Sequence, residues 1–421
     1  MTGRWIDAGI RFFLYALIFW LPYSSAAVEI CVIGSGILWI IKRLLLLKSA
    51  NRTISGILRI FTPVQNPLNR WIGIFLFIAF LASLGSLDPA ESLSNLFTKT
   101  FEWFAVYFLV LEVFNQKKHW QIAATVFFVT SAMVLVDGLV QSYITQKDFL
   151  NGHTILPGGR VTSSLETANG LGAYLTVLIP VGLAFLSIEW KQRLRNIIFL
   201  LFFIISMWVL VLTFSRAAWL GVLIGMAFFL FLTKKVFLKK RSIIGILLLL
   251  GFCGILVMNR SNQIFSKDRV TSLGWRTVIW RNSLVMIKER PFFGHGINTY
   301  MKLLPYYQEG KSKQNPSYAH NCFLQLAAET GLLGLSAFLG MMITMFRETI
   351  TGIMTLQRTN GEVARLILGL LSGCLAFLIQ SFFDTNLYSL KLSVYFWLIV
   401  GMIFSLYNLF CTKENCGINN V

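Results

Sequence analysis

The sequence predicts an all-α, polytopic membrane protein with about twelve transmembrane helices, and three observations lead to this fold class. Of the 421 residues, 56% are hydrophobic and only 13% are charged, which is about half the charged share of a typical soluble domain. Apolar runs of about 18 to 25 residues, long enough to cross a bilayer, recur along the whole chain. Lys and Arg gather in alternate links between these runs, as they do in multi-pass membrane proteins.

Each predicted span is an apolar run that ends at a polar, basic or helix-breaking residue, as the first does at Pro22. The twelve spans are about Ile10–Leu21, Ala26–Leu47, Trp71–Leu87, Phe97–Phe114, Trp120–Ile144, Gly170–Ile188, Asn196–Thr213, Ala217–Leu232, Ile243–Met258, Cys322–Met345, Leu366–Phe383 and Leu392–Phe410. The chain is therefore expected to divide into residues 1–258 with nine spans, one long extracytoplasmic loop over 259–321, and residues 322–421 with three spans and a short cytoplasmic tail.

The basic charge indicates membrane topology rather than nucleic-acid binding. The net charge is +19, with 37 Lys plus Arg, and the basic links follow the second, fourth, sixth, eighth and tenth predicted spans. An even number of spans then places both termini and these links in the cytoplasm. The loop that holds Arg160, the turn that holds Arg216 and the long loop fall on the extracytoplasmic side. No nucleic-acid partner is expected.

The long loop is the one extended polar segment of the chain. From Asn259 to Asn321 it carries ten Lys or Arg against three Asp or Glu. Apolar residues recur at helical spacing from about Leu273 to Glu289, which predicts an amphipathic helix at the membrane interface that ends before Pro291; they are Trp275, Val278, Ile279, Val285 and Met286. Arg276 and Trp280 are four residues apart and share a face of this helix.

Three residues on the extracytoplasmic side are candidates for chemistry. Arg216 lies at a tight turn between two spans, where it either contacts lipid headgroups or binds an anionic ligand. Arg276 is either an ordinary interfacial base or part of the same anion site. His320, one of four histidines, stands before the tenth predicted span, where it is either structural or a general base.

Metal chemistry is not predicted. No HExxH motif, Cys/His cluster, Walker A motif or DxD pair occurs, so no metal and no cofactor are expected. The six cysteines show no metal-ligand spacing and are expected to be thiols buried in the membrane. Guanidinium groups bind phosphate oxygens bidentately. The cationic residues therefore suggest a lipid-linked sugar diphosphate, whose leaving group needs charge neutralisation while the attacking hydroxyl needs a base.

Several motifs resemble the O-antigen ligase and O-antigen polymerase superfamily of bacterial envelope enzymes. The matching segments are SRAAWLG (215–221), Arg276 with Trp280, ERPFFGHGINTY (289–300) and AHNCFLQLAAETGLLG (319–334). Weaker matches are GRVTSSLETANGLGAYL (159–175) and FFDTNLY (382–388). The pattern covers about residues 159–406, whereas the first five spans resemble the family only in their layout.

The resemblance implies a metal-independent, inverting glycosyltransferase at the outer face of the bacterial inner membrane. Its donor would be a glycan on undecaprenyl diphosphate, and its acceptor a hydroxyl of lipid A core or a similar glycan. Arg216, Arg276 and Arg160 would bind the diphosphate, and His320 would be the general base. Support from the surrounding structure would come from Asn321, Trp280 and Glu329.

Two alternatives stay open at the sequence level. The segment from Tyr300 to Ala319 is shorter than in many ligases, which leaves open a polymerase that extends the glycan on its lipid carrier. The second alternative is a flippase or transporter for the same lipid. A flippase would line a cavity through the membrane with cations, whereas most predicted spans here lack charge. Membrane lipids are expected neighbours in every case.

Overall fold

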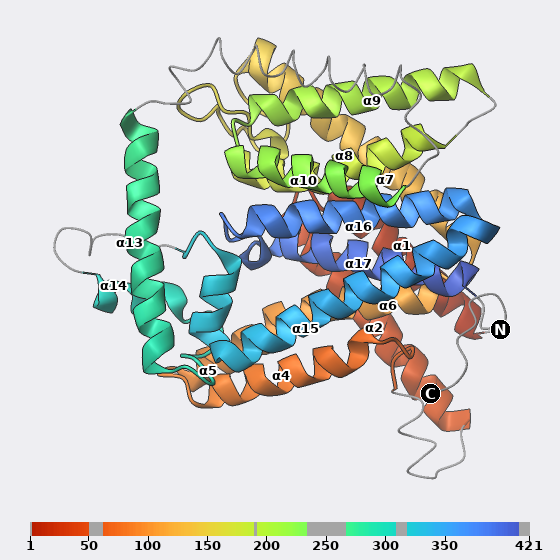
Figure 1. Cartoon of the computed structure of the whole chain (residues 1–421). Coiled ribbons are helices and arrows are strands. Elements are labelled where there is room, and N and C mark those ends of the chain that lie inside the picture. Colours follow the sequence, from red (N-terminus) through yellow and green to blue (C-terminus); the bar gives the residue numbers. More distant parts are fainter. Residues whose placement is uncertain (1, 50–61, 189–191, 234–266, 309–317, 412–421) are drawn as a thin grey trace.

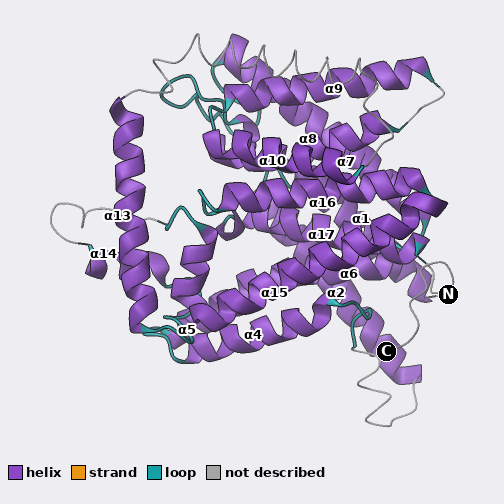
Figure 2. Ribbon diagram, viewed as in Figure 1, coloured by secondary structure: helices purple, strands orange, loops and turns teal. Residues whose placement is uncertain are grey.

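A computed structural model describes residues 2–49, 62–188, 192–233, 267–308 and 318–411. Helices make up the regular structure of this part of the chain, which contains no β-strand beyond two isolated bridges, Lys147 with Thr154 and Leu156 with Arg160. Figure 1 shows the helices running side by side in one bundle, and Figure 2 shows that the loops lie mainly at its two ends. The predicted all-α class is confirmed.

The helices before the long loop follow the predicted spans closely. They are α1 (Thr2–Trp20), α2 (Ser25–Ser49), α4 (Leu68–Leu84), α5 (Pro89–Asn95), the π-helix η1 (Leu96–Thr100), α6 (Phe101–Val113), α7 (Lys117–Val140), the π-helix η2 (Gln141–Thr145), the 3₁₀-helix η3 (Ser163–Leu165), α8 (Ala168–Ser187), α9 (Arg193–Leu212) and α10 (Arg216–Leu232). The predicted ninth span, about Ile243–Met258, lies outside the described residues.

The remaining elements are α13 (Lys267–Glu289), α14 (Tyr300–Tyr307), α15 (Cys322–Thr359), α16 (Gly361–Ser381), the 3₁₀-helix η5 (Asn386–Tyr388) and α17 (Leu390–Phe410). Among the described residues, seven helices are long and apolar enough to cross a membrane: α2, α7 with η2, α8, α9, α15, α16 and α17. Helices α4 and α10 are apolar but shorter. A count of about twelve spans and the place of the long loop between the ninth and tenth remain predictions.

Small residues bring α16 into close contact with α8 and α10. A Cβ on Gly221 of α10 would lie 2.4 Å from the carbonyl oxygen of Ala376, and a Cβ on Gly373 of α16 would lie 2.9 Å from the Cα of Val177 on α8. Close backbone approach of this kind is how helices associate in a lipid environment. These contacts fix the ends of the three helices, which carry most of the candidate site.

The described ends of the helices lie at two opposite ends of the bundle. The turn after α1, the loop before α8, the turn between α9 and α10, and the segment between α16 and α17 meet at one end of the bundle. Asn151, for example, donates to the carbonyl oxygen of Tyr23, and Val161 donates to that of Leu212. Figure 1 shows α13 lying across this same end. Helix α1 begins and α17 ends at the opposite end.

Helix α13 ends at Glu289, as predicted, and its five apolar residues lie on one side of the helix but have different surroundings. Ile279 and Met286 are fully buried against α14 and α15, whereas Trp275, Val278 and Val285 are exposed. The amphipathic helix at the membrane interface stays a prediction, but protein covers part of its apolar side. One side of the helix packs on protein, and the other apolar residues face outward, which suits a helix that lies between the protein and the lipid interface.

Helix α15 is interrupted at Gly331, which the sequence did not predict. Gly331 has φ 69° and ψ −179°, a conformation that is essentially restricted to glycine. The backbone of residues 291–296 enters this break: Leu332 N–H donates to the carbonyl of Pro291 at 2.7 Å, and Gly296 N–H donates to that of Glu329 at 2.8 Å. The turn that follows α13 is thus fastened to the first segment of α15, Cys322–Thr330.

Three cysteines among the described residues, Cys31, Cys322 and Cys374, are buried free thiols, as expected. Cys411, just after α17, is disulfide-bonded, so the expectation of a thiol is wrong at that position.

Candidate functional site

Three predicted arginines line one pocket at the end of the bundle that α13 crosses. Arg160 comes from the loop before η3, Arg216 is the first residue of α10, and Arg276 lies on α13. Ser215, Asn169 and Phe383 are among the other lining residues, and the pocket holds about 480 Å³ of empty space, including the solvent at its mouth. The structure therefore gathers residues that are far apart in the sequence into one cationic concavity.

Arg160 is held by two hydrogen bonds that also tie the loop to neighbouring helices. Its Nε donates to the carbonyl oxygen of Thr213 at 3.0 Å, and its Nη2 donates to Oδ1 of Asn169 at 2.8 Å. A tight turn precedes it, in which Gly158 and Gly159 both have positive φ, at 80° and 72°. The loop thus presents its guanidinium group at a fixed place beside the turn between α9 and α10.

Arg276 is a partly desolvated cation in the same pocket. Burial lowers the pKa of its guanidinium group, Asp384 opposes that shift, and the positive charge of Arg216 adds to it. Guanidinium groups stay protonated at neutral pH, so the result is two cations that repel each other across the pocket. An anion bound between them relieves that repulsion, which makes the pocket suited to a phosphate or diphosphate.

His320 pairs with Asp384, a residue that the sequence did not single out. The imidazole Nδ1 lies 3.3 Å from Oδ1 of Asp384, and the two positions are 64 residues apart in the chain. Burial opposes ionisation of Asp384, but hydrogen bonding and charge attraction from His320, helped by Thr385 N–H and Arg276, give a net lowering of its pKa. Asp384 is therefore an anion that can fix the orientation of the imidazole ring.

A chain of hydrogen bonds connects this pair to the arginine pocket. Oδ2 of Asp384 accepts from Nδ2 of Asn169 at 2.6 Å, and Oδ1 of Asn169 accepts from Arg160. Gln380 donates to the backbone carbonyl of Asn169 at 2.8 Å. His320, Asp384, Asn169 and Arg160 therefore form one continuous polar network. The signals in the sequence were Asp384 in FFDTNLY and Asn169 in the segment 159–175, but neither pattern reveals a contact between them.

The three residues expected in supporting roles all make contacts that shape this region. Asn321 caps α15, because its Oδ1 accepts from Phe323 N–H and Leu324 N–H at 2.9 and 3.0 Å. Trp280 donates from Nε1 to the carbonyl of Ala319 at 3.0 Å, next to His320. Glu329 is buried and accepts from Asn298 N–H at 3.0 Å. These contacts link α13 and the turn after it to the start of α15.

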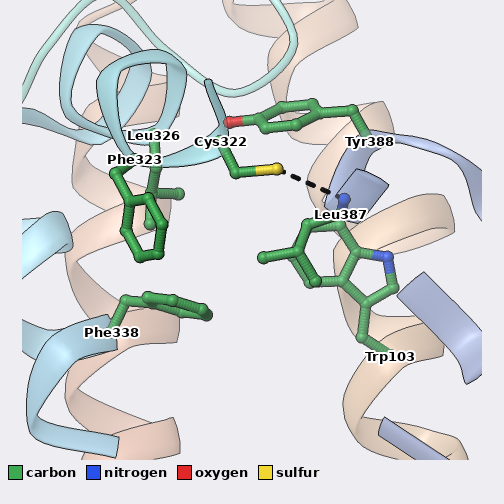
Figure 3. Close-up of a pocket in the computed structure, with 7 residues that line it drawn as sticks. All are labelled: Trp103, Cys322, Phe323, Leu326, Phe338, Leu387 and Tyr388. Atoms are coloured by element: carbon green, nitrogen blue, oxygen red, sulfur yellow. Dashed lines mark hydrogen bonds between the residues drawn. The ribbon is translucent and has the colours of Figure 1, made fainter. Parts of the chain in front are cut away.

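A second, apolar pocket lies between the first turns of α15 and the segment that follows Asp384. Figure 3 shows Trp103, Phe323, Phe338 and Leu387 around it, with Cys322 at its edge. The thiol of Cys322 accepts from Leu387 N–H at 3.4 Å and donates to the backbone carbonyl of Asp384 at 3.3 Å. Cys322 therefore attaches the segment that carries Asp384 to the first turn of α15.

The described residues contain no group of three or more His, Cys, Asp or Glu side chains placed to hold a metal ion. The titratable groups at the site are instead one imidazole and one carboxylate beside three guanidinium groups. This set can bind an anion, orient the imidazole and move one proton to it.

Comparison with known proteins bears on the same residues. Residues 200–339 match the family model described as O-antigen ligase. Over this stretch the chain is similar to the O-antigen ligase family. The matched stretch contains Arg216, Arg276 and His320, whereas Arg160 and Asp384 lie outside it.

Two curated proteins share similarity with parts of this chain. An uncharacterised protein of Haemophilus influenzae is 28% identical over 182 residues, which cover 38% of this chain and 44% of that protein. A ComP-specific O-oligosaccharyltransferase of Acinetobacter baylyi is 24% identical over 279 residues, which cover 64% of this chain and 45% of that protein. The chain thus spans less than half the length of either relative.

Proposed function

We propose that this protein transfers a glycan from undecaprenyl diphosphate to an acceptor hydroxyl. The observation that carries the proposal is the convergence of Arg160, Arg216 and Arg276 on one pocket, connected through Asn169 and Asp384 to His320. The similarity of residues 200–339 to the O-antigen ligase family supports this type of reaction. A site of this kind supplies both requirements of the transfer, since it neutralises a leaving diphosphate and offers a base to the acceptor.

In the proposed reaction, His320 accepts the proton of the acceptor hydroxyl as its oxygen attacks the anomeric carbon of the donor sugar. The bond between that carbon and the diphosphate oxygen breaks, and undecaprenyl diphosphate leaves with the electron pair. Attack from the face opposite the leaving group inverts the anomeric centre. The arginines stabilise the negative charge that grows on the leaving diphosphate.

Asp384 gives His320 the orientation that this step needs. With Nδ1–H donating to the carboxylate, Nε2 carries the free lone pair and can accept a proton. The carboxylate also stabilises the imidazolium ion that forms when the acceptor is deprotonated. Asn169 holds the other carboxylate oxygen, so rotation of the Asp384 side chain away from His320 costs a hydrogen bond.

The site is proposed to face the extracytoplasmic side of the bacterial inner membrane, with both termini in the cytoplasm. The end of the bundle opposite the site carries described basic residues in the first or last turns of its helices, including Lys117, Lys118, Arg193 and Arg358. Basic residues at the ends of spans remain in the cytoplasm according to the positive-inside rule. The donor diphosphate would then meet the arginines at the level of the lipid headgroups.

Lipid A core or a similar glycan is the first candidate acceptor, and a lipid-linked glycan extended by a polymerase is the second. A ComP-like protein is the third candidate acceptor, because the Acinetobacter baylyi relative is named a ComP-specific O-oligosaccharyltransferase. A pure flippase would not need His320 paired with Asp384 beside the diphosphate pocket.

The decisive assay uses purified protein in detergent with a lipid-linked oligosaccharide donor. Lipid A core, a second lipid-linked repeat unit and a ComP-like protein are supplied separately as acceptors. Formation of a product identifies the acceptor and excludes a pure flippase, because no two-sided membrane is present. The His320→Ala variant is the control for non-enzymatic transfer. No product with any of these acceptors, from protein that still binds donor, would contradict the proposed transfer.

A further inference from the structure

The amino end of α10 opens into the arginine pocket. Ser215, Arg216 and Ala217 all line the pocket, and they are the N-cap residue and the first two residues of the helix. The first N–H groups of a helix have no acceptor within the helix, and together with the helix dipole they attract anions. The backbone of α10 therefore directs partial positive charge toward the place where the arginine side chains meet.

Ser215 occupies the N-cap position but does not cap the helix. Its backbone has the extended conformation typical of an N-cap, yet its side chain makes no capping hydrogen bond. Only 3% of the residue is exposed, and its Oγ is buried without a hydrogen-bond partner within the described part of the chain. Thr167 and Asn321, by contrast, cap α8 and α15 through their side chains.

Buried polar atoms are nearly always hydrogen-bonded, so an unpartnered hydroxyl at a pocket points to a missing ligand. Helix α8 packs closely against this serine. A Cβ on Gly172 of α8 would lie 2.9 Å from Cβ of Ala218 and 3.3 Å from Oγ of Ser215. The glycine therefore lets α8 approach the first turn of α10 without displacing the hydroxyl.

We propose that the amino end of α10 binds one phosphate of the donor diphosphate. The N–H groups of Ala217 and Ala218 donate to the phosphate oxygens, and the Ser215 hydroxyl, rotated about its Cα–Cβ bond toward the pocket, donates to the same phosphate. Arg216, on the same helical turn, adds a full positive charge. This inference rests on the proposed function for the identity of the ligand, and it assigns Ser215 and the backbone of α10 to the binding site.

The site would recognise the phosphate itself, whether or not it carries a lipid. Two probes separate these sources: farnesyl diphosphate, which has a short isoprenoid tail, and inorganic pyrophosphate, which has none. Weakening of both probes by a change at Ser215 supports a phosphate site on α10. A change that weakens neither probe contradicts it.

The test compares Ser215→Asn and Ser215→Ala by measuring affinity for both probes with purified protein in detergent. Asparagine is a strong helix cap, so its side chain would occupy the N–H groups of the first turn while the helix stays intact. We expect Ser215→Asn to bind about tenfold more weakly, with an unchanged or higher melting temperature. Ser215→Ala, which only removes the hydroxyl, should bind about fivefold more weakly and decides the question if asparagine disturbs folding.

Two controls make the outcome specific. Ser187→Ala, at the opposite end of α8, should leave the affinity unchanged. Arg276→Ala tests the pocket without touching α10. Weaker binding in Arg276→Ala with wild-type affinity in both Ser215 variants would overturn the inference and leave the proposed function standing. Wild-type affinity in all three variants would reject the diphosphate pocket, and with it both proposals.

Discussion

Replacement of Asp384 with asparagine tests the role of the polar network in catalysis. The amide keeps the size of the side chain but removes the negative charge. Its Oδ1 can still accept from His320, whereas its Nδ2 would face the Nδ2 of Asn169, which now donates to Asp384 at 2.6 Å. If the side-chain amide of Asn169 flips to compensate, its Nδ2 instead of its Oδ1 faces the guanidinium group of Arg160. The hydrogen bond between Arg160 and Asn169 is then lost.

The magnitude follows from the contacts that change. At least one hydrogen bond between a charged and a neutral group is lost, and each such bond contributes about 1.5–3 kcal/mol. We therefore expect the rate of transfer to fall by about tenfold to 150-fold. Donor affinity should change less, because the arginines that line the pocket remain. The assay measures kcat for glycan transfer and, separately, the Kd for farnesyl diphosphate.

Asp88→Asn is the matched control. Asp88 lies at the same end of the bundle, pairs with Lys302 and is half-exposed, so its loss should leave both quantities unchanged. A kcat for Asp384→Asn equal to that of the wild type would refute the orienting role of Asp384. A loss of donor affinity as large as the loss of kcat would show instead that the network mainly shapes the arginine pocket.

Two further predictions concern the way the site is built. Gly331→Ala should lower the free energy of unfolding by at least about 1–3 kcal/mol and weaken donor binding, because a Cβ there would lie 2.1 Å from the carbonyl oxygen of Phe292; thermal unfolding in detergent measures this. Gly274→Ala on α13, where a Cβ would meet nothing within 4 Å, is the control, and equal stability of the two variants would contradict the role given to the break in α15. The lowered pKa of Asp384 means that its stabilising contribution is complete above the ordinary aspartate pKa of about 3.9 and is lost as the pH falls through the lower, folded-state value. The difference in melting temperature between the wild type and Asp384→Asn should therefore shrink as the pH falls below about 4, and a difference that is constant with pH would show that the charge of Asp384 does not stabilise the fold.

The helices could be predicted because their apolar runs are long and their ends carry clear signals. Pro22, the basic links and the polar loop before α8 all mark ends that the structure confirms to within a few residues. The length of α15 could not be predicted in the same way. Its continuation from Arg347 to Thr359 is too polar to predict as a span but remains helical, because Ile353 and Leu356 are buried there and packing extends the helix.

The break at Gly331 could not be predicted, because a single glycine inside a helical pattern is compatible with an unbroken helix as well as with a break. Only the contact with the backbone of residues 291–296 shows why glycine is required there. The surroundings of the apolar residues on α13 could not be predicted for a related reason. Periodicity shows which residues share a face, but it cannot show which of two partners, protein or lipid, each apolar residue contacts.

The cationic half of the site could be predicted from single residues, whereas its polar network could not. An arginine at a tight turn or on an interfacial helix is conspicuous in an apolar sequence. Asn169 and Asp384 are separated by 215 residues, and neither is unusual where it stands. Their roles depend on which helix ends meet, and that is decided by the close packing of α16 against α8 and α10.

The most direct test of the central claim separates donor binding from transfer in three variants. Farnesyl diphosphate binding and glycan transfer are measured for His320→Ala, Arg216→Ala and Arg276→Ala. The account predicts that His320→Ala abolishes transfer and binds the probe like the wild type, whereas each arginine variant binds the probe more weakly, by about 1.5–3 kcal/mol for a lost charged hydrogen bond. Wild-type affinity in both arginine variants, or undiminished transfer by His320→Ala, would contradict it.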